Sequence, residues 1–182
     1  MIAFSGSWFR RRGALKKAVA EAYGRLLREA LMPVHYETRG AIDNFEGRAQ
    51  MVTVMTALAC SRLAAIGGPL AAEMTERLNA LVLDGFDAAF REKGVGDHSI
   101  ARKVRTLAES HSGLGRALLA ALQETDSDTA LADVLRRNGV VKAEQLGAMT
   151  DALRRYQSVF AGQTDAEILT GGFACGGHEP AA

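Results

Sequence analysis

The sequence predicts an all-α, single-domain protein, and three observations support that fold class. Apolar residues make up 48% of the chain but aromatic residues only 6%, and the abundant alanine and leucine favour helix over sheet. Along most of the chain, apolar residues recur at three- and four-residue spacing, the period of a helix with one buried face. A length of 182 residues suffices for one hydrophobic core and is short for two. We therefore expect one bundle of about six helices.

Three of these helices fall in the first half of the chain, at about residues 14–30, 44–66 and 69–93. Pro33 closes the first helix. The stretch that follows has no helical period and contains Gly40, so we expect an extended connector over residues 34–44.

The junctions of the second and third helices carry clear local signals. Asp43 or Asn44 can cap the second helix, and its continuous apolar stripe predicts a central position in the bundle. Gly67-Gly68-Pro69 ends that helix and begins the next, because glycine suits a C-terminal cap and proline suits a first helical turn.

The second half of the chain is expected to form three more helices. One spans about residues 99–123, a shorter one ends at Asn138-Gly139, and the last reaches about Phe160. From residue 162 on, the glycine-rich sequence has too few apolar residues to stay ordered. The expected organisation is a basic, aromatic segment, a helical domain and a flexible C-terminal tail, at residues 1–12, 13–161 and 162–182.

Composition also argues against several protein classes. Lys and Arg total 22 against 21 for Asp and Glu, so the surface is not built to neutralise nucleic acid. The two cysteines, Cys60 and Cys175, indicate no disulfide framework and a reducing compartment. No apolar run reaches the roughly 18 residues of a membrane span. The order of the N-terminal residues is wrong for a secretory signal, whereas a mitochondrial targeting peptide stays open.

The sequence predicts no catalytic residues, no metal site and no cofactor. The four histidines, His35, His98, His111 and His178, do not cluster in the sequence, and His111 falls on an apolar helix face, where we expect a core histidine. Cys175 and His178 supply two soft ligands, but a structural zinc site takes four. A helical enzyme would require scattered histidines or acids to converge in one pocket.

Two basic regions indicate binding surfaces. The first lies at the N-terminus, where arginines follow aromatic residues; this pattern suits an anionic membrane surface, and a disordered basic tail is the alternative. The expected membrane-surface residues are Trp8, Phe9, Arg10, Arg11 and Arg12.

The second basic region lies on both sides of the loop at residues 94–97, between two long helices. Its glycines permit positive φ, so the loop brings the basic side chains of both helix ends together. Such a patch suits an acidic partner segment or lipid headgroups, and solvated helix ends are the alternative. The cations are Arg91, Lys93, Arg102, Lys103 and Arg105.

Two segments resemble the ubiquinol–cytochrome c chaperone family. They are Asn44-Phe-Glu-Gly-Arg48, before the long apolar helix, and Phe90-Arg-Glu-Lys-Gly-Val-Gly-Asp97, followed by the basic residues 99–105. Pro33-Val-His-Tyr36 is similar to the proline and tyrosine that precede the same helix in the family. The resemblance covers about residues 20–140.

The resemblance implies an all-helical, non-enzymatic assembly factor for the cytochrome bc1 complex, one that binds newly made cytochrome b. It implies no cofactor, leaves room for a second assembly factor, and places the chain in the cytoplasm against the inner membrane, or on the matrix side in a eukaryote. A peripheral membrane-surface or other protein-binding adaptor is the alternative. The implied partner-binding residues are Tyr36, Phe45, Gly47, Arg48, Arg91, Glu92, Gly94, Gly96, Asp97, Arg102, Lys103 and Arg105.

Two of these positions also have a structural alternative. Arg48 can pair with Glu46 or Glu92 inside the fold, in place of contacting a partner. Gly47 can serve only to let helices pack closely.

Overall fold

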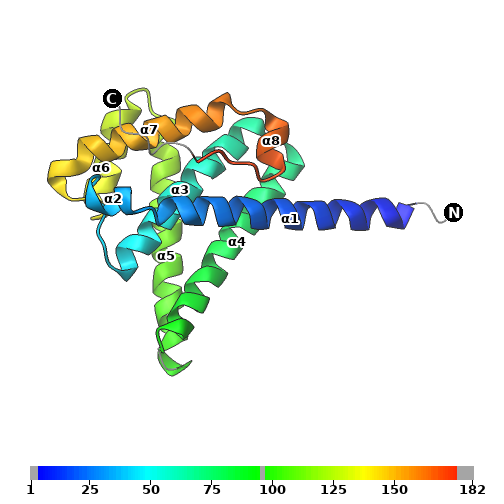
Figure 1. Cartoon of the computed structure of the whole chain (residues 1–182), viewed down its shortest axis with the longest axis horizontal. Helices are drawn as coiled ribbons and strands as arrows, with labels where there is room; N and C mark the ends of the chain where they lie inside the picture. The colour runs from blue at the N-terminus through cyan, green and yellow to red at the C-terminus, as the bar shows by residue number, and fades with distance from the viewer. Residues whose placement is uncertain (1–3, 95–96, 176–182) are drawn as a thin grey trace.

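The structure of the protein is a computed structural model that describes residues 4–94 and 97–175 (Figure 1). Within that part, the regular elements are helices, and the six helices expected from the sequence correspond to α1 and α3 to α7, which confirms the all-α fold. The helices are α1 (Phe4–Ala30), α2 (Pro33–Glu37), α3 (Phe45–Ile66), α4 (Gly68–Glu92), α5 (Asp97–Ala121), α6 (Ser127–Arg137), η1 (Ala143–Gln145), α7 (Leu146–Gly162) and α8 (Asp165–Leu169).

Helix α3 is the central helix of the bundle, as its apolar stripe predicted. It packs against α1, α4, α5 and α7, and every residue from Met51 to Cys60 is buried. Asn44 caps it, because the Asn44 side chain accepts a hydrogen bond from the Gly47 N–H at 2.7 Å. By length and composition α3 could span a bilayer, but 67% of its most apolar window is buried inside the protein. Burial in the core accounts for this composition.

The first helix and the connector after it differ from the sequence prediction. Helix α1 begins at Phe4 rather than at about residue 14, so most of the expected basic N-terminal segment is helical. This helix extends past the rest of the protein (Figure 1). The connector expected to be extended contains α2, a single turn that starts at Pro33. Five residues are too few for a helical period to show in the sequence.

The predicted tail boundary at residue 162 is also wrong. The chain continues into α8, and Ile168 and Phe173 are both fully buried. The Phe173 ring meets the Phe160 ring edge-on, with 5.1 Å between the ring centres. Apolar packing therefore orders the chain as far as Cys175, and residues 176–182 lie outside the described part.

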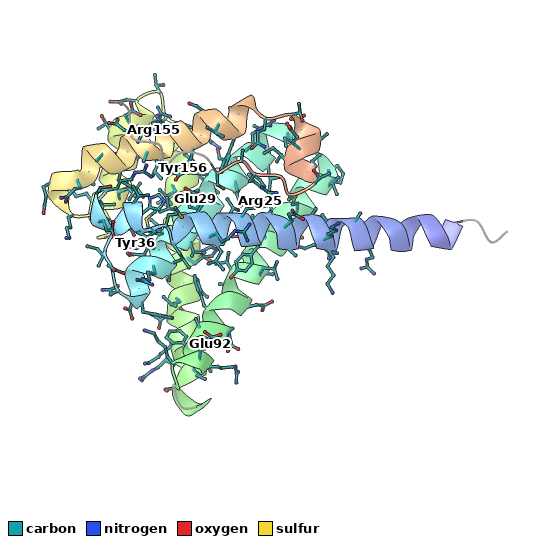
Figure 2. All side chains as sticks on the ribbon, viewed as in Figure 1. Arg25, Glu29, Tyr36, Glu92, Arg155 and Tyr156 are labelled. Carbon is teal, nitrogen blue, oxygen red and sulfur yellow. The ribbon has the colours of Figure 1, made fainter. Side chains whose placement is uncertain are left out.

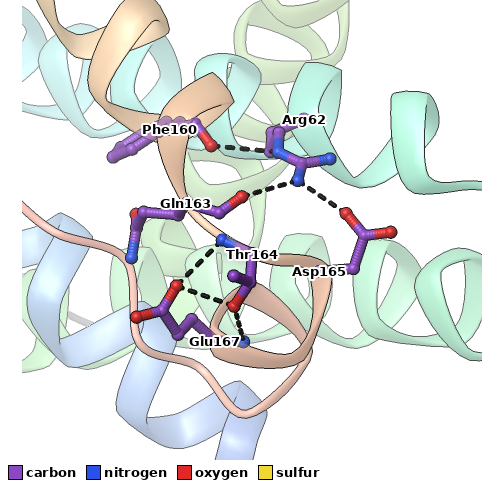
Figure 3. A network of polar contacts seen from close by, with 6 residues as sticks. All are labelled: Arg62, Phe160, Gln163, Thr164, Asp165 and Glu167. Carbon is purple, nitrogen blue, oxygen red and sulfur yellow. Dashed lines mark hydrogen bonds and ion pairs between the residues drawn. The ribbon is translucent and has the colours of Figure 1, made fainter.

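A polar network fixes α8 to the central helix (Figure 3). Arg62 of α3 donates to the carbonyl oxygens of Phe160 and Gln163, each at 2.9 Å, and to Asp165 Oδ1 at 2.6 Å. Thr164 and Glu167 form a capping box at the start of α8. Arg62 thus satisfies backbone carbonyl groups at the end of α7 and pairs with a carboxylate at the beginning of α8.

A second polar cluster is buried between α1, α2 and α7, and Figure 2 shows two of its members, Glu29 and Tyr156, facing each other. The Tyr156 hydroxyl donates to Glu29 and accepts from Arg39 at 3.5 Å. Arg39 also lies 3.5 Å from His35 Nδ1. The four side chains are at most 6% exposed, so the bundle carries hydrogen-bonded, charged groups in its interior.

Helices α4 and α5 form a hairpin whose far end projects from the body (Figure 1). Gly94 follows the end of α4 with φ of 69°, in the left-handed region that glycine adopts without strain. The predicted glycine turn between two long helices is therefore confirmed at Gly94.

Candidate functional site

The end of the hairpin is joined to the start of α3 by an aromatic pair. The rings of Phe45 and Phe90 lie 4.7 Å apart, centre to centre. The Lys93 ammonium nitrogen is 4.4 Å from the centre of the Phe45 ring, and that of Lys103 is 5.8 Å from the centre of the Phe90 ring. Each such contact contributes about 0.5–1 kcal/mol at an exposed site. Both lysines remain exposed, so each presents its charge to solvent from a fixed aromatic support.

Tyr36 and Arg48 extend this cluster from α3 to α2. The Arg48 guanidinium carbon is 5.5 Å from the centre of the Tyr36 ring. The Tyr36 hydroxyl donates to the Ala30 carbonyl oxygen at 2.8 Å, and burial raises the pKa of Tyr36 to about 12. The hydroxyl therefore stays protonated at neutral pH and holds the ring in place beneath Arg48.

Arg48 forms an ion pair, but with neither of the two expected acids. Its Nε donates to Asp43 Oδ1 at 2.8 Å, and both side chains are 55% exposed. The expected pairing with Glu46 or Glu92 is therefore wrong. Asp43 lies in the connector just before α3, within reach of the first helical turn. Because it is outside the helix, the three- and four-residue spacing of helical ion pairs does not predict this contact.

Gly47 has a structural role, because a Cβ atom at this position would lie 2.0 Å from the Ile42 carbonyl oxygen. That distance is far below a van der Waals contact, and the obstacle is backbone. The connector therefore passes the first turn of α3 at a point where only glycine fits.

The remaining basic residues lie along the hairpin. Arg91 pairs with Asp87 one turn earlier, at 2.7 Å. Arg102 and Arg105 are exposed and share one face of α5. Within the described residues, no carboxylate pairs with these two arginines. Figure 2 shows Tyr36 beside the body and Glu92 near the far end of the hairpin.

We call this region the basic–aromatic surface. It combines fixed aromatic rings with exposed cations and extends from α2 along the hairpin. Its residues are Tyr36, Phe45, Arg48, Phe90, Lys93, Arg102, Lys103 and Arg105.

Some expected site residues are only partly described. Asp97 is the first residue of α5, and Gly96 lies outside the described residues. Trp8, Phe9, Arg10 and Arg11 belong to α1, although their side chains are outside the described part. Arg12 is exposed.

Sequence reasoning did not select Phe90 as a site residue or Asp43 as a partner of Arg48. Phe90 lies in the helix predicted at about residues 69–93 and is buried. Its contact with Phe45 depends on how α4 packs against α3, for which the sequence offers no local signal. The start of the family-like segment at Phe90 was the one available indication.

His111 is buried, as predicted for a core histidine, and lines a cleft of about 490 Å³ between α3, α4 and α5. Its ring nitrogens lie 2.9 Å from Thr53 Oγ1 and 2.9 Å from Asn79 Oδ1. Phe86 packs against the ring edge-on. Burial lowers the pKa of His111, so the neutral ring is the form that the fold stabilises.

The stability of the protein should therefore fall when the pH drops below about 6.5, the ordinary histidine pKa. The pKa of His111 is lower in the folded state than in the unfolded chain, so the unfolded chain takes up the proton first. Urea unfolding at pH 7.5 and pH 5.5 measures this loss, and the His111→Gln variant should lose less than the wild type between the two pH values. An equal loss in both proteins would contradict the role given to His111.

The described residues contain no group of three or more His, Cys, Asp or Glu side chains that could hold a metal ion. The two thiols are poorly suited to nucleophilic chemistry, because burial raises the pKa of Cys60 to about 11 and that of Cys175 to about 12. His35 and His111 occupy separate sites, one beside Tyr156 and the other in the cleft.

Comparison with known proteins concerns the fold and the family of the chain. The chain is similar to the crystal structure of the Cbp3 homolog from Brucella abortus, with a TM-score of 0.75 and 22% identity over 91% of this chain and 92% of the other. That likeness shows a shared fold. No curated protein matches the sequence. The model of the family described as ubiquinol-cytochrome C chaperone matches residues 37–175, which include most of the basic–aromatic surface. The chain therefore belongs to the ubiquinol–cytochrome c chaperone family.

Proposed function

We propose that this chain is a non-enzymatic assembly chaperone of the cytochrome bc1 complex and that its client is newly made cytochrome b. Family membership supports the role in assembly. The basic–aromatic surface supports the binding of a polypeptide, because it sets exposed cations on fixed rings. Aromatic and arginine side chains contribute most of the binding energy in many protein interfaces.

The observation that carries this proposal is the pair of lysines on the Phe45 and Phe90 rings. Neither Lys93 nor Lys103 has a carboxylate partner among the described residues, so their charges are available to a client. Because the rings hold the lysines in place, binding costs less side-chain entropy than it would for two free lysines. A client segment with acidic residues next to apolar ones fits this chemistry.

In this proposal the chaperone lies in the cytoplasm against the inner membrane, or on the matrix side in a eukaryote. The support is α1, which extends beyond the body and exposes Arg12, Lys16 and Lys17 (Figure 1). Each basic side chain near anionic headgroups contributes about 1 kcal/mol. A helical adaptor that binds only the membrane surface is the alternative, and it would act without any cytochrome.

The test is a charge reversal at Arg102 and Arg105, which have no carboxylate partner among the described residues. In cells that lack the wild-type chain, the Arg102→Glu/Arg105→Glu variant should reduce the bc1 complex at least fivefold, because a repulsive surface rejects an acidic client. Difference spectra of the b-type haems and immunoblots of the bc1 subunits measure that level. Lys142→Glu/Arg155→Glu makes the same change in charge at exposed positions elsewhere and should support a normal level.

Wild-type amounts of the complex with the first variant, at equal chaperone abundance, would reject the proposed client surface. Replacing Arg10, Arg11 and Arg12 by Gln tests the membrane assignment. If vesicle binding is lost while bc1 levels stay normal, membrane binding is not required for assembly.

A further inference from the structure

A groove of about 860 Å³ lies between α1, α8 and the start of α4. Its α1 wall runs from Ala14 to Arg25, and the lining residues recur every three or four positions along one helix face. At 1.5 Å per residue this wall is about 16 Å long, enough for three helical turns. Leu70 is at the opposite end of α4 from Lys93, roughly 35 Å away along the helix, so the groove is separate from the basic–aromatic surface.

The walls of the groove are apolar and partly open to solvent. Leu70 is 47% exposed, although most large apolar side chains of the bundle are buried. Leu169 of α8 also lines the groove, and Ala14 and Ala18 line it from α1 with small side chains. Small residues four apart let another helix approach closely, since no long side chain holds it away. The shape and the chemistry fit the apolar face of a helix.

The charges on α1 indicate which helix fits. Lys17 lines the groove and has no carboxylate partner in the described part of the chain. Glu21 does not neutralise it, because Glu21 pairs with Arg25 at 3.4 Å. The neighbouring Lys16 adds to the positive potential along the exposed side of α1. An occupant that carries a carboxylate opposite Lys17 is favoured, and a basic occupant is repelled.

The same charges disfavour a second copy of this chain as the occupant. Packing α1 of one copy into the groove of another would bring two sets of arginines and lysines together, which costs binding free energy. The groove is also bounded by helices on two sides. That concave shape suits a rod better than the face of a bilayer.

We propose that the groove between α1 and α8 binds an amphipathic helix of a partner protein, with an apolar face against Leu70 and Leu169 and a carboxylate at Lys17. About three turns of the partner helix occupy the groove. The interaction is independent of client binding at the basic–aromatic surface. It gives the chaperone a second, separate protein contact.

The test uses the full chain and two labelled 18-residue helical peptides that share a Leu and Ala face. One peptide carries Glu beside that face and the other carries Lys, and fluorescence anisotropy gives their Kd values. The Glu peptide should bind the wild type at least tenfold more tightly than the Lys peptide. Leu70→Asp should weaken binding of the Glu peptide about tenfold. Leu31→Asp is the matched control, because Leu31 is 40% exposed outside the groove, and it should change the Kd less than twofold.

Charge exchange tests the orientation of the partner. Lys17→Glu should weaken the Glu peptide about fivefold and strengthen the Lys peptide, whereas the same change at the exposed Lys142, which is outside the groove lining, should do neither. Circular dichroism checks that each variant is folded. The proposal is overturned if Leu31→Asp and Leu70→Asp weaken binding equally, or if the Glu peptide does not bind. It is also overturned if neither peptide binds and Leu70→Asp instead abolishes a dimer detected by sedimentation. The same holds if neither peptide binds and Leu70→Asp abolishes binding to phosphatidylglycerol vesicles.

Discussion

Replacing Gly47 by alanine should lower the free energy of unfolding by about 3 kcal/mol. The added methyl group would overlap the Ile42 carbonyl oxygen, at 2.0 Å, and backbone cannot move aside as a flexible side chain can. Either the connector shifts or the first turn of α3 unwinds, and both changes disturb the hydrogen bond from Gly47 to the Asn44 cap. For a domain of this size the melting temperature should fall by roughly 9 °C.

Gly113 provides the matched control for this change. It lies within α5, and a Cβ atom added there would meet nothing within 4 Å, so alanine should be neutral or stabilising by up to about 1 kcal/mol. Thermal and urea unfolding of the two variants measure both values. If Gly47→Ala were as stable as Gly113→Ala, the close approach would be wrong, and the glycine would have to be explained by partner contact alone.

The second large loss is expected from Arg39→Met, at about 3 kcal/mol. Arg39 is 6% exposed and bonds Tyr156, whose hydroxyl also donates to the buried Glu29. Removing the guanidinium takes a buried positive charge and a donor away from the Tyr156 hydroxyl, which itself donates to the Glu29 carboxylate. The cost arises mainly from that carboxylate, since methionine fills most of the same volume.

A double-mutant cycle tests this explanation. Glu29→Gln in the Arg39→Met background should cost much less than the sum of the two single changes, because the carboxylate that requires compensation is then absent. Urea unfolding of the four proteins supplies the cycle. Additive losses would show that Arg39 and Glu29 do not interact through this cluster.

The elements that the sequence predicted well are those specified by local signals. The apolar stripe of α3, the Asn44 cap and the Gly67-Gly68-Pro69 junction each depend on residues that are close in the chain. The structure ends α3 at Ile66 and begins α4 at Gly68, as those signals require.

The elements that it missed depend on contacts between distant segments. Helix α8 and Phe173 are ordered by Phe160 and Arg62, which belong to other helices. In a short glycine-rich sequence, nothing marks such packing in advance. The start of α1 was missed for a related reason, because residues 4–13 have no apolar period and only the backbone shows that the helix continues.

The candidate site was predicted as a set of positions rather than as a geometry. The sequence predicted that the cations of α4 and α5 lie near one loop, and the structure has them near the two helix ends that this loop joins. It could not show that Lys93 rests on Phe45 or that Arg91 is engaged by Asp87, since these contacts depend on side-chain direction. Neither structural alternative holds as predicted: the close approach at Gly47 is with the connector at Ile42 and not with another helix, and the internal partner of Arg48 is Asp43.

The proposed binding of newly made cytochrome b to the basic–aromatic surface can be tested by crosslinking. Its most direct test places a photo-crosslinking amino acid at Arg102 in one version of the chain and at the exposed Arg155 in another, during synthesis of labelled cytochrome b (Figure 2). A crosslink to cytochrome b from position 102, weak or absent from position 155, is the predicted result. Equal crosslinking from both positions, or crosslinking from position 155 alone, would contradict the account.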